Sequence, residues 1–212
     1  MKTLVVPFLS LNTPPDEIAG LQTIDIEPWS ITLQPSCEAA FSISHFNHGI
    51  CIRYSISEPF ISAKKRKIND EVHQDNCVEF FIALGNDTDY YNFEFNCLGS
   101  IKAAFGKDRY NRCSLPIEEL SKLHESMEIS IDNTLDNKQI KWSLKVVLGQ
   151  DVFVHHSEQL FDGLTCSANF TKCGDALPNP HFLSWVGLSS ATPDFHQPLS
   201  FGKLIFESLE IV

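Results

Sequence analysis

Polar and apolar, mostly aromatic, side chains alternate along residues 91–97, and this pattern offers the clearest chemistry in the sequence. Asn92, Glu94 and Asn96 fall on one face of an extended segment, and the intervening aromatic residues fall on the other. If the aromatic face is the core, the three polar side chains point away from it. Amide and carboxylate groups on a preformed surface suit the vicinal hydroxyls of a sugar. An ordinary solvated sheet face is the alternative interpretation.

Glu79 interrupts the nearly continuous apolar run of residues 77–84, which is typical of a buried strand. It either accepts hydroxyl protons or is a buried glutamate paired with a cation such as Arg53 or Arg109. With Glu94 on a neighbouring strand it could also form the acid and nucleophile pair of a glycoside hydrolase. Sequence alone does not fix the carboxylate separation, so both alternatives stay open.

Strand patterns dominate the elements that must position these residues. Period-two alternation over 50–57 and 91–97 and short apolar runs elsewhere predict strands at 50–57, 77–84, 91–97, 127–131, 142–148, 166–172, 182–186 and 201–207. A hairpin joins the 77–84 and 91–97 strands. Helical signals are confined to 115–123 and one turn within 151–161. We expect an all-β, two-sheet antiparallel β-sandwich with a short helix or two in its loops.

No break in composition divides the chain, so residues 1–212 are expected to form a single domain. Residues 1–35 contain five prolines and are predicted to wrap the sandwich core, residues 38–207, as an irregular N-terminal arm. The basic run at 63–70 is interpreted as a solvated loop.

Three ordered segments resemble the family 9 carbohydrate-binding modules. Residues 51–59 and then Gln74-Asp75-Asn76-Cys77-Val78-Glu79-Phe80-Phe81-Ile82 are similar to that family's strand, loop and acid-x-x-V-E-x-F-I strand, and residues 90–96 to the strand that follows. The segment from Leu183-Ser184-Trp185 through Asp194-Phe195-His196 to Phe201-Gly202-Lys203-Leu204 is similar to the family's closing I-S-W and F-G-x-L region. The resemblance implies an immunoglobulin-like sandwich that grips the end of a sugar chain without transforming it.

The family's site can be carried over residue by residue. Phe195 falls where one tryptophan of the family's sugar slot stands, with Trp185 or His196 beside it, and Val72 or His73 stands at the other tryptophan. Glu79 and Asn96 match a binding glutamate and asparagine, Glu94 replaces a binding arginine, and Lys172 lies near a glutamine. The resemblance thus implies a ligand-binding set made of Phe195, Glu79, Glu94, Asn96, Lys172, Trp185 and His196, with no catalytic residue.

Charge and hydropathy exclude other partners. The net charge of −11 argues against nucleic acid and anionic membranes, and no apolar run is long enough to span a bilayer. The N-terminal segment lacks the features of a signal peptide.

The cysteines are odd in number, scattered and without a CxxC pair, which is typical of small buried hydrophobes. We expect a cytoplasmic location, with the periplasm as the alternative.

No cofactor or metal centre is expected. The histidines show no paired ligand spacing, and His196 is singled out only because it follows Phe195. Residues 86–89 are a candidate loop for a structural calcium ion, with a plain hairpin turn as the alternative.

The sequence therefore predicts non-catalytic carbohydrate binding, with a saccharide or glycan fragment as the partner and an enzyme acting in trans. A protein-interaction scaffold that has lost sugar binding, and a glycoside hydrolase using Glu79 and Glu94, are the alternatives.

Overall fold

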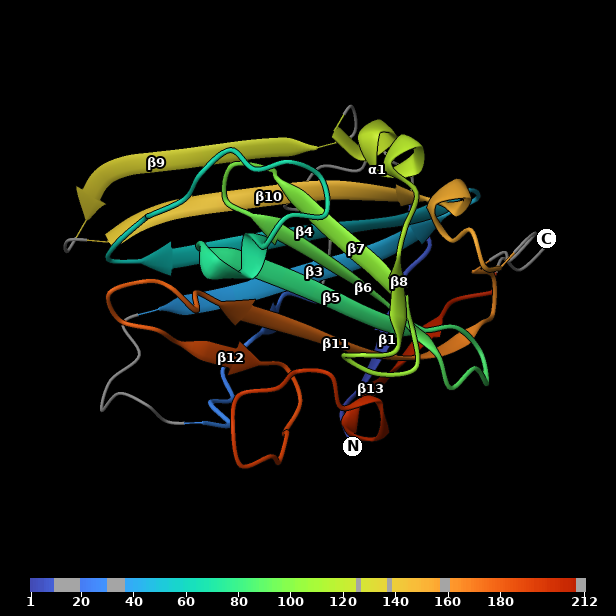
Figure 1. Ribbon diagram of the computed structural model, residues 1–212. Coiled ribbons are helices and arrows are strands. Elements are labelled where there is room, and N and C mark those ends of the chain that lie inside the picture. The colour runs from blue at the N-terminus through green and yellow to red at the C-terminus, as the bar shows by residue number, and fades with distance from the viewer. Residues whose placement is uncertain (10–19, 30–36, 125–126, 137–138, 157–160, 209–212) are drawn as a thin grey trace.

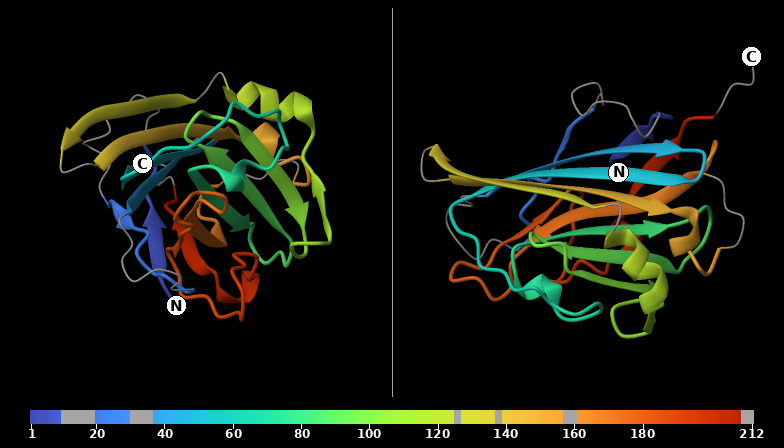
Figure 2. Two further views of the ribbon diagram at one scale, coloured as in Figure 1. Left: turned by 60° about the vertical axis from the view of Figure 1, so that its left-hand side comes forward. Right: turned by 90° about the horizontal axis from the view of Figure 1, so that it is seen from above.

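The strands of the computed structural model form two sheets that pack face to face (Figure 1). The structure describes residues 1–9, 20–29, 37–124, 127–136, 139–156 and 161–208. The larger sheet has the order β1-β13-β11-β5-β6-β7-β8, with β12 also paired to β11, and the smaller has the order β2-β3-β4-β10-β9. Figure 2 shows the two layers from above. The predicted two-sheet sandwich is confirmed.

The element bounds follow the predicted strands closely, with several additions. The strands are β1 (Thr3–Val6), β2 (Gln22–Thr23), β3 (Glu38–Phe46), β4 (Gly49–Glu58), β5 (Cys77–Ala83), β6 (Tyr90–Asn96), β7 (Ile101–Gly106), β8 (Arg112–Ser114), β9 (Glu128–Asp136), β10 (Gln139–Gly149), β11 (Thr165–Cys173), β12 (Phe182–Ser184) and β13 (Gly202–Phe206). The α-helix α1 spans Ile117–Leu123, and 3-10 turns cover Val72–Gln74, Gln150–Val152 and Pro198–Ser200. The helical turn predicted within 151–161 is thus a 3-10 turn at its start.

The N-terminal segment is not only an irregular arm. Residues of β1 pair with β13, Leu4 opposite Leu204, in a parallel arrangement, and β2 pairs antiparallel with β3. Each short strand supplies backbone partners to a sheet edge that would otherwise leave its N–H and C=O groups unpaired. Val6 is fully buried, so β1 also adds to the core.

Aromatic packing between the sheets decides which way the strands face. The Phe170 ring stacks on Phe41 of the opposite sheet, with ring centroids 3.5 Å apart, and on Phe80, with centroids 4.8 Å apart. Phe80 lies opposite Phe93 in the β5–β6 register. Because side chains alternate across a strand, Glu79 and Glu94 must point to the outer face of the larger sheet.

The basic run is anchored rather than solvated at Arg66. Its guanidinium Nε and Nη2 each donate at 2.8 Å to a different oxygen of Asp75. This bidentate pair is largely buried, and it fixes the segment that precedes β5. The expectation of a solvated loop is therefore wrong for Arg66, because the buried Asp75 carboxylate requires a partner.

Six of the seven cysteines are buried and all are free thiols, and Cys113 is the exposed one. No helix in the described ranges is long and apolar enough to cross a bilayer.

Candidate functional site

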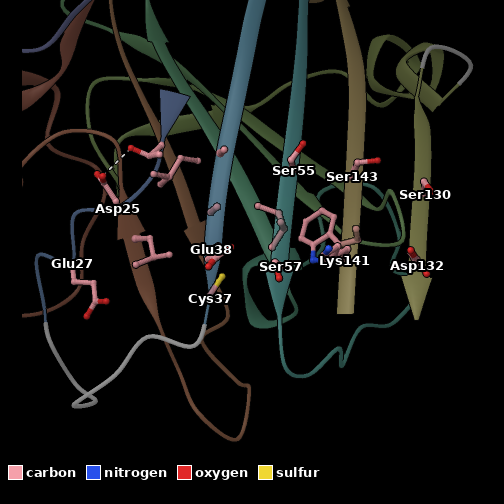
Figure 3. A pocket seen from close by; sticks show the side chains of 17 residues that line it. Asp25, Glu27, Cys37, Glu38, Ser55, Ser57, Ser130, Asp132, Lys141 and Ser143 are labelled. Atoms are coloured by element: carbon pink, nitrogen blue, oxygen red, sulfur yellow. Dashed lines mark hydrogen bonds between the residues drawn. The ribbon is translucent and has the colours of Figure 1, made fainter. Parts of the chain in front are cut away.

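Each sheet carries a hollow on its outer face. The larger, about 630 Å³, crosses the smaller sheet and has a floor of small side chains. Figure 3 shows Ser55, Ser57, Ser143 and Ser130 projecting into it from successive strands. The smaller hollow, about 310 Å³, lies on the larger sheet and collects buried charged groups. Four predicted site residues line this smaller cavity: Glu79, Glu94, Phe195 and His196.

Glu79 and Glu94 form the floor of the cavity. They lie directly opposite each other on β5 and β6, and their residues are only 4 % and 2 % exposed. The polar face predicted for residues 92–96 thus does face away from the core, but surrounding loops cover it. A buried carboxyl group on a sheet face is costly unless it has partners, so those partners determine what the cavity can bind.

Glu79 has neutral partners. Its Oε2 accepts a hydrogen bond from Asn92 Nδ2 at 3.3 Å, and its Oε1 accepts one from the Cys173 thiol at 3.3 Å. Within the described residues no lysine or arginine forms an ion pair with it, so the predicted pairing with Arg53 or Arg109 is not found. Burial and then the adjacent Glu94 charge raise the pKa of Glu79 to about 8. Glu79 therefore carries a proton at neutral pH.

Glu94 is surrounded by cations. Lys102 Nζ lies 4.0 Å and Arg112 Nη2 lies 3.8 Å from its Oε1, and His73 Nδ1 lies 3.5 Å from its Oε2. The interaction with Glu94 raises the pKa of His73. None of these contacts is a close hydrogen bond, and Glu94 Oε2 is buried with no hydrogen-bond partner in the described part of the chain. Glu94 thus keeps acceptor capacity for a ligand.

Aromatic rings form the walls of the cavity. Phe195 lies with its ring centroid 5.5 Å from Trp29 and 6.1 Å from Phe182, and it is only 7 % exposed. Phe195 therefore belongs to the packed core rather than to a free loop, and it offers a ligand little of its face. Tyr110, which also lines the cavity, is 86 % exposed. It is the ring most available for stacking on a sugar.

His196 lies in the same wall and is half-buried. Its Nδ1 is 2.8 Å from the Tyr90 hydroxyl. Burial, followed by the nearby Arg112 charge, lowers the pKa of His196 to about 2. The ring is therefore neutral and held by Tyr90, so it can shape the cavity and offer a polar edge to a ligand.

Asn96 lies outside the cavity, and its side chain is fully committed. Its Nδ2 donates at 2.8 Å to Asp75 Oδ2 and at 2.8 Å to the Lys64 carbonyl, and its Oδ1 accepts from the Leu98 and Ser100 amides. These contacts give Asn96 a structural role, and the structure does not bring it together with Glu79 and Glu94 in the cavity. Asn96 ties β6 to the anchored segment before β5.

Lys172 and Trp185 lie on the inner side of the larger sheet. Lys172 is opposite Val78 in register, and its Nζ pairs with Glu58 Oε2 at 3.0 Å and contacts His181 Nε2 at 2.7 Å. Trp185 packs edge-on against Phe41 and Phe170. Strand alternation turns Thr171 outward and Lys172 inward, so neither Lys172 nor Trp185 reaches the cavity.

Several cavity residues were not predicted as ligand contacts. Lys102 and Arg112 lie on β7 and β8, and Tyr110 lies between these strands. The apolar–polar–apolar alternation of Ile101, Lys102 and Ala103 is a signal for the strand β7, and it is weak because it covers only three residues. His73, one of the two residues that the resemblance sets at a slot tryptophan, does line the cavity.

Comparison with known proteins decides the family. The sequence profile described as carbohydrate-binding family 9 matches residues 15–206. The chain belongs to carbohydrate-binding family 9. This membership confirms the resemblance and the prediction of a carbohydrate-binding domain.

Solved structures agree with the family 9 assignment. A protein from Bacteroides uniformis ATCC 8492, named a "putative carbohydrate-binding protein", is 31 % identical, with a TM-score of 0.84 over 97 % of this chain and 99 % of that one. Two family 9 modules from Caldicellulosiruptor kristjanssonii, in complex with glucose and with cellotriose, are each 12 % identical, with TM-scores of 0.62 and 0.58. The glucose complex covers 100 % of this chain and 98 % of its own chain, and the cellotriose complex covers 98 % and 94 %. At 12 % identity these structures show the fold alone. No curated protein matches the chain.

The candidate calcium loop, residues 86–89, lies in the connection between β5 and β6. The Asp87 carboxylate contacts His156 Nε2 at 3.1 Å and accepts the Asp89 amide at 3.2 Å. The Asp87 carboxylate, one of the expected calcium ligands, therefore already has protein partners. A structural calcium ion in this loop stays a prediction.

Proposed function

We propose that the cavity over β5 and β6 binds the terminal sugar of a saccharide chain and does not cleave it. The observation that carries this proposal is the buried Oε2 of Glu94 at the floor of an accessible cavity, which accepts no hydrogen bond within the described residues and lies 3.5 Å from His73 Nδ1. An orphaned buried acceptor costs free energy unless a ligand or water supplies the donor. A sugar hydroxyl is such a donor.

The floor supplies both halves of hydroxyl recognition. Protonated Glu79 can donate to a hydroxyl oxygen, whereas Glu94 Oε2 can accept from a hydroxyl hydrogen. Lys102 and Arg112 add donors beside Glu94. A sugar hydroxyl donates and accepts at once, so neighbouring donor and acceptor groups match a vicinal pair of hydroxyls.

Size and shape favour a chain end. A cavity of about 310 Å³ is near the lower limit for small-molecule sites, so it suits about one or two sugar rings. The exposed Tyr110 ring stands where a ring entering the cavity would stack. The complexes of other family 9 modules with glucose and cellotriose make glucose oligosaccharides the first class to test.

The arrangement of the carboxyl groups favours binding over hydrolysis. A glycosidase places its two carboxyl groups on either side of the scissile bond. Glu79 and Glu94 are instead neighbours on one sheet face and approach a ligand from the same side. We therefore propose that the protein is not an enzyme and that any partner enzyme acts in trans.

Calorimetric titration of the full chain with glucose, cellotriose and a wider glycan panel tests the proposal. The Glu94→Gln variant should lose about 10-fold or more in affinity for any saccharide that binds, because a hydrogen bond to a charged group is removed. Glu118→Gln, on exposed α1, is the matched control and should bind like the wild type. A panel with no binder, or equal affinity in Glu94→Gln, would contradict the proposal and favour an interaction scaffold.

A further inference from the structure

Two cysteines and a glutamate meet beneath the cavity. Cys77 of β5 lies directly opposite Cys173 of β11, and Glu79 lies two residues further along β5 on the same face. The two sulfur atoms and a Glu79 carboxylate oxygen all lie within 4.8 Å of one another, and all three residues are buried. Cys173 Sγ is 3.3 Å from Glu79 Oε1. Strand register, rather than a flexible loop, brings these groups together.

A second cluster of potential metal ligands in the same protein has a lysine ammonium group where an ion would bind. Cys37, Glu58 and His181 are also within 4.8 Å of one another. There the Lys172 ammonium fills the cluster, 3.0 Å from Glu58 and 2.7 Å from His181. In the described ranges no lysine or arginine forms an ion pair with Glu79, and Lys172 itself points to the other face of β11. The Cys77–Glu79–Cys173 cluster therefore lacks the cation that its counterpart has.

The geometry fits a tetrahedral ion. With zinc–sulfur bonds of about 2.3 Å and zinc–oxygen bonds of about 2.0–2.2 Å, ligand atoms are about 3.5–3.8 Å apart. The 3.3 Å separation of Cys173 Sγ and Glu79 Oε1 is already near this value. Two soft thiolates select zinc or a similar thiophilic ion over calcium or magnesium. Glu79 lines the cavity, which gives an ion a route from solvent.

We propose that Cys77, Cys173 and Glu79 bind one thiophilic divalent metal ion, with zinc as its physiological representative. Three protein ligands leave a fourth position for a water molecule or a ligand hydroxyl. Binding forms two metal–sulfur bonds and one metal–oxygen bond, and the two thiols and the Glu79 carboxyl release their protons to solvent. No electron is transferred. The site stands on its own geometry and does not depend on saccharide binding. In the metal-bound form Glu79 is a ligand carboxylate, so the proton that it holds in the metal-free protein is no longer available to a sugar hydroxyl.

Titration of the full, reduced chain with Co²⁺ in the absence of chelating thiols tests this site. Tetrahedral cobalt with thiolate ligands gives a sulfur-to-cobalt charge-transfer band in the near ultraviolet and intense visible bands. We expect both bands to saturate at one ion per chain, and added Zn²⁺ to abolish them. Absence of a charge-transfer band in folded, reduced protein would overturn the proposal.

Three variants identify the ligands. Cys77→Ser and Cys173→Ser should each lower Co²⁺ affinity by at least about 100-fold, since even residues beyond the direct ligands change affinity by about 10- to 100-fold. The nearly isosteric Glu79→Gln keeps the packing and should weaken and shift the visible bands. Cys113→Ser removes the exposed thiol and should leave the spectrum unchanged. A band that survives in both Cys77→Ser and Cys173→Ser, or disappears in Cys113→Ser, would refute the assignment.

Discussion

Glu79 and Glu94 lie opposite each other on β5 and β6, yet only Glu94 is surrounded by cations. Burial and the adjacent Glu94 raise the pKa of Glu79 to about 8, so Glu79 retains its proton at neutral pH, whereas Glu94 lies within 4.0 Å of three basic groups. The resulting donor and acceptor lie side by side at the floor of one cavity. This asymmetry is the main chemical feature of the candidate site.

The protonated Glu79 makes stability depend on pH. Its folded pKa of about 8 lies above the ordinary value of 4.5. Between these values the folded chain holds a proton that the unfolded chain releases, so the free energy of unfolding falls as pH rises from 4.5 towards 8. The raised pKa of His73 acts in the same direction as pH rises above 6.5. Urea unfolding at pH 6.5 and 8.5 should therefore show lower stability at the higher pH.

Glu79→Gln separates the carboxyl contribution from that of His73. This variant cannot ionise at residue 79, so its loss of stability between the two pH values should be smaller than that of the wild type. Glu118→Gln should keep the full wild-type loss. Equal losses in Glu79→Gln and the wild type would show that Glu79 is ionised in the folded protein.

Tyr110→Ala should weaken saccharide binding by about fivefold, which is the size of a single aromatic stacking contribution. The ring is 86 % exposed, so the midpoint of thermal unfolding should stay unchanged. Calorimetry and thermal melts measure the two effects. Tyr110→Phe retains the ring and should bind like the wild type, and a full loss of binding in this variant would refute stacking.

Phe195→Ala should destabilise the fold by about 3 kcal/mol, because it empties space against Trp29 and Phe182. Urea denaturation gives the free energy of unfolding directly. Phe195→Leu fills more of the space and should cost less. An Ala variant as stable as the wild type would show that the Phe195 ring does not contribute to the core.

Lys172→Ala should lower the free energy of unfolding by about 3–5 kcal/mol, because it removes the ammonium group that balances the buried Glu58 charge and leaves only the Trp142 hydrogen bond and the nearby His181 ring as neighbours. Saccharide affinity of the remaining folded protein should not change. The double variant Lys172→Met/Glu58→Gln removes both charges and should recover part of the stability. A selective loss of affinity in Lys172→Met/Glu58→Gln would restore Lys172 to the site.

Local patterns were sufficient to predict the hairpin and the floor of the site. Alternation over residues 91–97 assigned the polar face correctly, because the pleat of a strand fixes which side chains share a face. The apolar run at 77–84 identified β5 because both of its faces are covered.

The walls depend on pairings that the sequence does not display. β7 and β8 are short, so the arrival of Lys102, Arg112 and Tyr110 at the cavity follows from sheet order rather than from local periodicity. The family resemblance placed Lys172 in the ligand-binding set. Its burial reflects a partner, Glu58, that is distant in sequence, and burial of a cation is tolerated only with such a partner.

Backbone amide NMR of the full chain, titrated with the best-binding saccharide, distinguishes the cavity over β5 and β6 from the larger hollow on the opposite sheet. The largest shift changes should follow β5, β6 and the β7–β8 connection, centred on Glu79, Glu94 and Tyr110. Changes centred instead on Ser55, Ser57 and Ser143 of the opposite hollow would contradict this expectation.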